Sequence, residues 1–148
     1  MKYSDVGLKM TEHFEGCKLK AYLDSVGVPT IGYGHTRGVK LGDKCTPEQA
    51  EAWLRDDIEC AEHAVSALVK VELQQFQFDA LVDFVFNLGA GAFAHSTLLK
   101  LVNAGDFKVA ELEFRRWSRA GGKVLAGLYK RRIAEEDLFD GPDTVPSP

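Results

Sequence analysis

The sequence is poor in cysteine, and its three cysteines (Cys17, Cys45 and Cys60) stand far apart. An odd number without a close pair argues against a disulfide framework. No CxxC or HxxxH spacing occurs, which argues against a zinc site, and no other pattern calls for a metal or a cofactor. We therefore expect three free thiols in a reducing compartment. A nucleophilic Cys17 is the alternative, although no histidine lies at a telling spacing from it.

The N-terminus lacks the apolar run of a signal peptide or a signal-anchor, because no hydrophobic stretch follows its first charged residues. We therefore expect a soluble chain made in the cytoplasm, without stable insertion into a membrane. If the target lies beyond the membrane, a second protein must let the chain through.

The chain has only a small excess of acidic charge, −4 overall, but its charges are unevenly spread. The 148 residues are 45% hydrophobic and 27% charged, which is typical of a globular protein with a buried core. Residues 48–83 hold nine acidic and two basic side chains, and residues 100–132 hold nine basic and three acidic ones. Solvated helix faces explain the acidic block. The basic block suits a polyanionic partner, and the acidic net charge disfavours nucleic acid relative to a cell wall.

The first half of the sequence predicts a helix followed by a small sheet. Ser4 can cap a helix whose apolar side chains are Val6, Met10 and Phe14, and Gly16 ends it. Five glycines and one proline then punctuate an alternating pattern between residues 18 and 42. This pattern predicts a twisted hairpin or a three-stranded sheet, with backbone exposed to a ligand.

The rest of the sequence is helical in pattern. A capping box at residues 46–49 starts a helix over 47–68, which is long enough to link two lobes. Residues 76–88 are apolar on nearly all sides and predict a core helix that Gly89 and Gly91 end. Ser96 and Asp106 look like caps of helices over 97–104 and 107–117. A break at Gly121 and Gly122 precedes a last helix over 128–139, and we expect the polar tail, 140–148, to be disordered.

These elements predict an α+β fold in a single domain over residues 1–139. The small lobe covers about 14–45, the linking helix about 47–68, and the helical lobe about 70–139 with the N-terminal helix packed on it. A cleft between the lobes is the expected ligand site.

Two carboxylates near the start of the small lobe fit the chemistry of glycoside hydrolysis, which needs one protonated and one ionised carboxyl group. Glu15 ends a helix beside Phe14, and both the helix dipole and an apolar neighbour favour its protonated form. Asp24 follows the first strand in a polar turn, which favours ionisation. The structural alternatives are a turn residue for Asp24, a strand residue for Thr30, and a hydrogen-bonding partner for His35.

Residues 14–36, FEGCKLKAYLDSVGVPTIGYGHT, closely resemble the signature of the T4-type phage lysozymes, glycoside hydrolase family 24. The family pattern is a Glu and an Asp separated by eight residues, and then a Thr after five more residues. Glu15, Asp24 and Thr30 match both gaps. The resemblance continues in residues 86–93, 96–99, 117–123 and 127–132. Within the family, the chain looks most similar to endolysins of lambdoid-type phages.

The resemblance implies an endolysin that hydrolyses the β-1,4 bond between N-acetylmuramic acid and N-acetylglucosamine of peptidoglycan for host lysis. Glu15 would be the general acid, and Asp24 and Thr30 would activate the water of an inverting reaction, which needs carboxyl groups roughly 6.5–9.5 Å apart. A lysozyme-like fold, a monomer, and release from the host cytoplasm to the periplasm by a holin are also implied.

The resemblance further implies substrate-binding roles for Phe86, Thr36 and Thr97. Phe86 equally suits a core position, and Thr36 stands where the best-known member has a larger apolar residue. Arg131 and Arg132 match a basic pair of the family; we expect one of them near Glu15 or the wall and the other as a surface charge.

Three other functions remain open from the sequence. A lytic transglycosylase also uses one Glu, but its chemistry needs no carboxylate to hold water, so Asp24 and Thr30 argue against it. A cell-wall-binding module without turnover would not need the three residues together. Nucleic-acid binding by the basic block is the remotest alternative, and it predicts a steep salt dependence.

Overall fold

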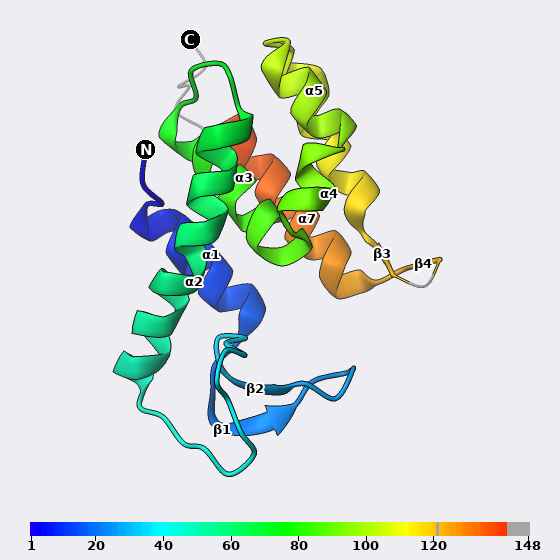
Figure 1. Cartoon of the computed structure of the whole chain (residues 1–148). Helices are drawn as coiled ribbons and strands as arrows, with labels where there is room; N and C mark the ends of the chain where they lie inside the picture. The colour runs from blue at the N-terminus through cyan, green and yellow to red at the C-terminus, as the bar shows by residue number, and fades with distance from the viewer. Residues whose placement is uncertain (121, 142–148) are drawn as a thin grey trace, which may run out of the picture.

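The computed structural model describes residues 1–120 and 122–141, and it is mainly helical. In chain order its elements are α1 (Asp5–Glu15), β1 (Lys18–Leu23), β2 (Pro29–Gly32), α2 (Pro47–Leu68), α3 (Gln75–Leu88), α4 (Ala90–Ala94), α5 (Thr97–Asn103), α6 (Phe107–Glu113), the 3-10 helix η1 (Phe114–Trp117), β3 (Arg119–Ala120), β4 (Lys123–Val124) and α7 (Ala126–Asp140). The β1–β2 hairpin lies at one end, the remaining helices gather at the other, and α2 runs between them (Figure 1). The expected α+β class is confirmed.

Helix α1 begins and ends where the sequence predicts. The Ser4 hydroxyl accepts a hydrogen bond from the Gly7 amide at 3.3 Å, which caps the helix. Its buried face differs from the expected one, because Leu8 and Thr11 are buried whereas Val6 is 65% exposed. The helix packs against α3 through a partly polar face, and the apolar spacing of Val6, Met10 and Phe14 did not reveal that face.

The small sheet is an antiparallel hairpin with a third segment beside it. Strand β1 pairs with β2, with Tyr22 opposite Thr30 and a register shift towards Lys18. On the other edge of β1, the Ala21 amide donates to the Asp43 carbonyl and the Cys45 amide to the Leu19 carbonyl, both at 2.9 Å. The described structure therefore lies between the two expected forms, a hairpin and a three-stranded sheet.

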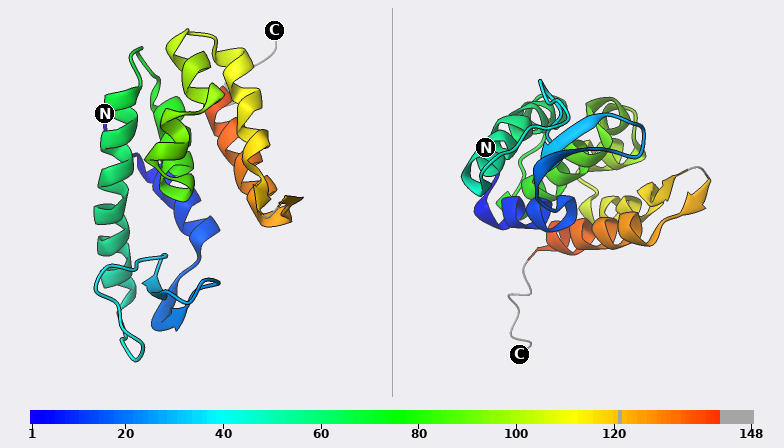
Figure 2. Two further views of the ribbon diagram at one scale, coloured as in Figure 1. Left: turned by 45° about the vertical axis from the view of Figure 1, so that its right-hand side comes forward. Right: turned by 90° about the horizontal axis from the view of Figure 1, so that it is seen from below.

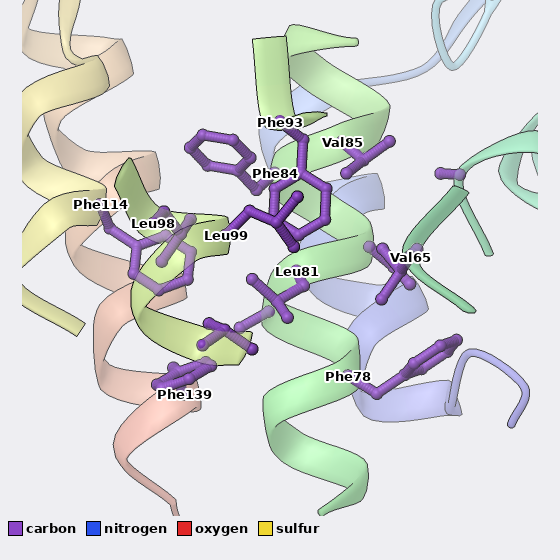
Figure 3. Close-up of a cluster of buried hydrophobic side chains, with 14 of the residues drawn as sticks. Val65, Phe78, Leu81, Phe84, Val85, Phe93, Leu98, Leu99, Phe114 and Phe139 are labelled. Atoms are coloured by element: carbon purple, nitrogen blue, oxygen red, sulfur yellow. The ribbon is translucent and has the colours of Figure 1, made fainter. Parts of the chain in front are cut away.

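Helix α3 is the centre of the helical part. Figure 3 shows the buried side chains gathered around it, and Figure 2 shows the other helices enclosing it. The cluster combines side chains from most of the helices, among them Leu8, Leu54, Val65, Phe78, Leu81, Phe84, Phe93, Leu98, Phe114 and Phe139. The expected core position of residues 76–88 is confirmed.

Some expected boundaries need correction. Gly91 lies inside the short helix α4 and does not end α3. Ser96 caps α5 through a 3.0 Å bond from the Leu99 amide, but Asp106 makes no side-chain cap. A short hairpin, whose strands β3 and β4 have two residues each, lies on either side of the break expected at Gly121 and Gly122. Helix α7 extends to Asp140, and residues 142–148 of the expected tail lie outside the described residues.

Both ends of the described chain reach the first turn of α3. The Gln75 side-chain amide donates to the Lys2 carbonyl at 2.8 Å. Gly141, which follows α7, packs so closely on Phe76 that a Cβ there would lie 3.0 Å from the ring. One helical turn thus holds the start and the end of the fold.

Among the described residues, no helix combines the length and the apolar character needed to cross a lipid bilayer.

Candidate active site

A pocket of about 320 Å³ lies where α1, the loop after β2, α2 and α3 meet. It is lined by Glu15, Gly34, Thr36, Arg37, Asp57, Phe86 and Asn87. A larger hollow of about 730 Å³ lies at the α2–α3 turn, and it is lined mainly by apolar side chains with Glu72 as its one carboxylate. Of these two, the smaller pocket contains Glu15, the carboxylate expected from the sequence, together with a second carboxylate, Asp57, so we take it as the candidate site.

Glu15 occupies the last position of α1, because Gly16 adopts a positive φ of 68° and turns the chain into the hairpin. Its side chain is 19% exposed, and its Oε2 accepts a 2.7 Å hydrogen bond from Arg131 Nη1. On the other side, a Cβ at Gly34 would lie 3.0 Å from Oε1. The carboxylate is thus confined between the guanidinium of α7 and the backbone that follows β2.

Arg131 is itself fixed by Asp83 of α3. Its Nε and Nη2 donate to the two Asp83 oxygens at 2.9 and 2.8 Å, and Thr11 Oγ1 donates to Asp83 Oδ1 at 2.7 Å. Burial opposes the charge on Arg131, but the hydrogen bonds and charges of Asp83 and Glu15 outweigh burial and raise the pKa of Arg131. The guanidinium therefore stays charged and links α1, α3 and α7.

A second buried pair lies beneath this contact. Arg132 is fully buried; its Nη2 donates to Asn87 Oδ1 at 2.8 Å and to Glu135 Oε2 at 3.0 Å. Burial raises the pKa of Glu135, and its hydrogen bond to the charged Asp83 raises it further. Burial would also raise the pKa of Asp83, but hydrogen bonds with Glu135 and Arg131 outweigh burial and lower that pKa to about 2.

Of the two arginines, Arg131 lies at Glu15 as expected, and the expectation of a surface charge is wrong for Arg132. The sequence alone does not reveal the burial of the two adjacent arginines, because the side chains that they contact come from α1 and α3. The setting of Glu15 is also more polar than Phe14 alone implied, since the Arg131 guanidinium lies 5.6 Å from the Phe14 ring centre and bonds the carboxylate.

Asp24 lies in the turn between β1 and β2, and its Oδ1 accepts hydrogen bonds from the amides of Val26 and Val28 at 2.9 and 2.8 Å. Thr30 is buried on β2, where its hydroxyl donates to the Val28 carbonyl at 2.8 Å. Asp24 is therefore a turn residue and Thr30 a strand residue, as their structural alternatives predicted. Neither side chain lines the Glu15 pocket, and both belong to the hairpin that leads into it.

The expected substrate-binding residues separate into two groups. Thr36 and Phe86 line the pocket together with Glu15. Thr97 is exposed in the first turn of α5 and is absent from this lining. Phe86 is also packed against the core, and its role in substrate binding stays a prediction.

Asp57 is a pocket residue that the sequence did not indicate. Its Oδ2 lies 2.8 Å from His35 Nδ1, and the His35 ring stacks on Trp53 with the ring centres 4.7 Å apart. The structural role expected of His35 is therefore present, because it ties the loop after β2 to α2. The sequence does not single out Asp57, because helix α2 carries five other acidic side chains.

The comparisons with known proteins point in one direction. The family model described as "Phage lysozyme" matches residues 12–135. An endolysin of Acyrthosiphon pisum secondary endosymbiont phage 1 is 47% identical over 144 residues, which cover 95% of this chain and 99% of that protein. An endolysin of Bacillus phage B103 is 44% identical over 94% of this chain, and the chain spans about half, 54%, of that longer protein.

Two solved structures share the fold. The muramidase domain of SpmX from Asticaccaulis excentricus has a TM-score of 0.90 and 40% identity, covering 95% of this chain and 99% of that one. A P22 lysozyme mutant has a TM-score of 0.86 and 40% identity, covering 94% and 98%. The expected lysozyme-like fold is therefore confirmed.

Proposed function

The chain belongs to the phage lysozyme family, and from this we propose that it is an endolysin muramidase. Its substrate is peptidoglycan, and it hydrolyses the β-1,4 bond between N-acetylmuramic acid and N-acetylglucosamine. The observation that carries the proposal is Glu15, a carboxylate fixed in a pocket between the hairpin and the helices. Similarity to phage endolysins and to a muramidase domain supports the same reaction.

In the proposed mechanism Glu15 gives its proton to the leaving oxygen of the scissile bond. Arg131 holds the carboxyl group in place. The bound glycan covers the pocket and removes water from it. After proton transfer, the same arginine stabilises the carboxylate that remains.

The water molecule is assigned to the hairpin. Asp24 acts as the base, with Thr30 as its partner, and attack from the far side of the sugar inverts the anomeric centre. Asp24 Oδ1 is engaged by the turn amides, while no hydrogen bond to Oδ2 is found among the described residues. Oδ2 is therefore the oxygen that we assign to the water.

In its host the protein acts as a monomer that lyses the cell and frees the phage. We assign its release from the cytoplasm to the periplasm to a holin. A lytic transglycosylase and a non-catalytic wall-binding module are the alternatives that the following test separates.

The test compares wild type with Glu15→Gln on outer-membrane-permeabilised Gram-negative cells and on purified sacculi. Glu59→Gln is the control. Glu59 is exposed on α2 and lies outside the pocket lining, so this substitution makes the same chemical change away from the site. We expect a loss of turnover of at least about 1,000-fold in Glu15→Gln, since the proton donor is removed and the shape is kept. The control should retain full activity.

Mass analysis of the released fragments identifies the reaction. Reducing N-acetylmuramic acid ends support hydrolysis, and anhydro ends would assign a transglycosylase. A folded wild type that binds sacculi without releasing fragments would assign a binding module. The anomer formed first, followed by NMR, tests inversion separately, and a retained anomer would contradict the roles given to Asp24 and Thr30.

A further inference from the structure

Arg37 is a charged lining residue of the Glu15 pocket to which the proposed reaction gives no role. It is exposed, and within residues 1–120 and 122–141 its side chain has neither an ion pair nor a hydrogen bond. Each of the other ionisable side chains in the lining already has a partner: Glu15 pairs with Arg131, and Asp57 with His35. Arg37 therefore presents a free guanidinium at the edge of the pocket.

The loop that carries Arg37 is fixed at its base. The amides and carbonyls of Ile31 and His35 bond each other at 2.9 Å in both directions. The His35 ring is held by Asp57 at 2.8 Å and stacks on Trp53. The base of the loop thus has little freedom, so the Arg37 backbone stays beside the pocket while its side chain is free to reach a ligand.

The charge of the lining points to the kind of group that Arg37 binds. Glu15 and Asp57 are already paired with Arg131 and His35, so among the described lining residues Arg37 is the charged side chain left to attract an anion. The N-acetylated sugars of a glycan strand are uncharged. The peptides linked to its muramic acid residues end in free carboxylates, and a guanidinium fork pairs with a carboxylate through two hydrogen bonds.

We propose that Arg37 binds a carboxylate of the peptide attached to the glycan strand, so that the protein favours strands that carry peptides. This inference rests on the proposed function and names a substrate feature beyond the scissile bond. It makes Arg37 a specificity-determining residue outside the proton transfer itself.

The test measures KM on three soluble preparations of one glycan: strands with peptides, the same strands with all carboxylates chemically amidated, and strands stripped of peptide by an amidase. We expect Arg37→Gln to raise KM about fivefold on the first and to leave it unchanged on the other two, since an exposed ion pair contributes up to about that factor. The kcat should not change. Arg37→Lys should give an intermediate KM, because it keeps the charge but loses the fork.

Arg55→Gln is the matched control. Arg55 is an exposed arginine of α2 outside the pocket lining, and the change alters net charge equally. Its KM should equal that of wild type on all three preparations. The difference caused by Arg37→Gln should also shrink as salt rises from 0.05 to about 0.5 M, because salt screens an exposed pair.

Three results would overturn the inference. An equal rise in KM on the amidated strands would assign Arg37 to the sugar, and a rise on the stripped strands would assign it to the lactyl carboxylate that the amidase frees. An unchanged KM on peptide-bearing strands would exclude any role. Binding of the three preparations to Glu15→Gln and to Glu15→Gln/Arg37→Gln, measured by calorimetry, separates this inference from the proposed function, since binding needs no turnover.

Discussion

The position of Glu15 depends on residues remote from it in the sequence. Arg131, which bonds its carboxylate, lies 116 positions away, and Asp83 orients Arg131 from a third helix. The local pattern around Glu15 predicted the helix end and the turn, because these depend on Gly16 and on the residues just before it. It did not reveal the arginine, since sequence spacing carries no information on which helices meet at the core.

Gly34 offers a test of how closely the backbone must approach Glu15. It has a φ of 78°, and a Cβ there would stand 3.0 Å from Glu15 Oε1. We expect Gly34→Ala to lower kcat at least about tenfold, because the carboxylate must move from its place against Arg131. The measurement is the rate of sacculus digestion by the variant at equal concentration of folded protein.

Gly38→Ala is the matched control, because Gly38 has a similar φ of 71° but open space around it. It should lose stability by about 1 kcal/mol, as Gly34→Ala does, and keep its kcat. Equal losses of kcat in the two variants would show that backbone strain, and not the contact with Glu15, is responsible.

At the scale of elements, the sequence predicted the helices that are long or that begin at a clear capping residue. The helix over 47–68 matches α2 residue for residue, and Ser96 caps α5 as expected. The β3–β4 hairpin and α4 were missed, because strands of two residues and a helix of five are too short to show a period. The buried place of Arg132 was missed because tertiary contacts, not composition, decide which face of α7 is covered.

The contact of α1, α3 and α7 at Asp83 predicts a dependence of stability on pH. The folded-state pKa of Asp83 is about 2 against an ordinary value of 3.8, so its ionised form stabilises the fold above pH 4. This contribution, on the order of 2 kcal/mol, is lost as pH falls from about 4 to 2. Asp83→Asn should therefore be less stable than wild type at pH 5, and the difference should shrink towards pH 2.

Urea denaturation followed by circular dichroism at several pH values measures this difference. Asp56→Asn serves as the control, since Asp56 is exposed on α2 and should show no such trend. A constant difference between wild type and Asp83→Asn from pH 5 to pH 2 would contradict the assigned role of Asp83.

At the scale of the whole molecule, the apolar core is unevenly shared. Nearly all fully buried apolar side chains belong to the helical part, whereas β1 has no buried residue and β2 contributes Ile31. The proposed acid and the proposed water-holding residues thus lie on either side of a boundary between a well-packed and a thinly packed region. The hairpin is held mainly through its backbone pairing and through the contacts of His35 with α2.

This difference predicts unequal protection from hydrogen exchange. Amides of β1 and β2 should exchange through local opening with a free energy at least about 2 kcal/mol below that of the α3 amides, because opening the hairpin exposes little apolar surface. NMR-detected exchange at neutral pH measures both sets. Equal protection of the hairpin and of α3 would mean that the molecule opens only as one unit.

The meeting of Lys2 and Gly141, near the two ends of the described residues, at the first turn of α3 has a consequence for connectivity. Lys2 and Gly141 are held by neighbouring residues, Gln75 and Phe76, so a short linker could close the backbone into a ring. The ring could then be opened elsewhere, for example in the exposed turn at Gly105, to give a circular permutant with the same contacts. In such a molecule α7 would precede α1 directly, and Arg131 and Glu15, now 116 positions apart, would be separated only by the end of α7, the linker and α1.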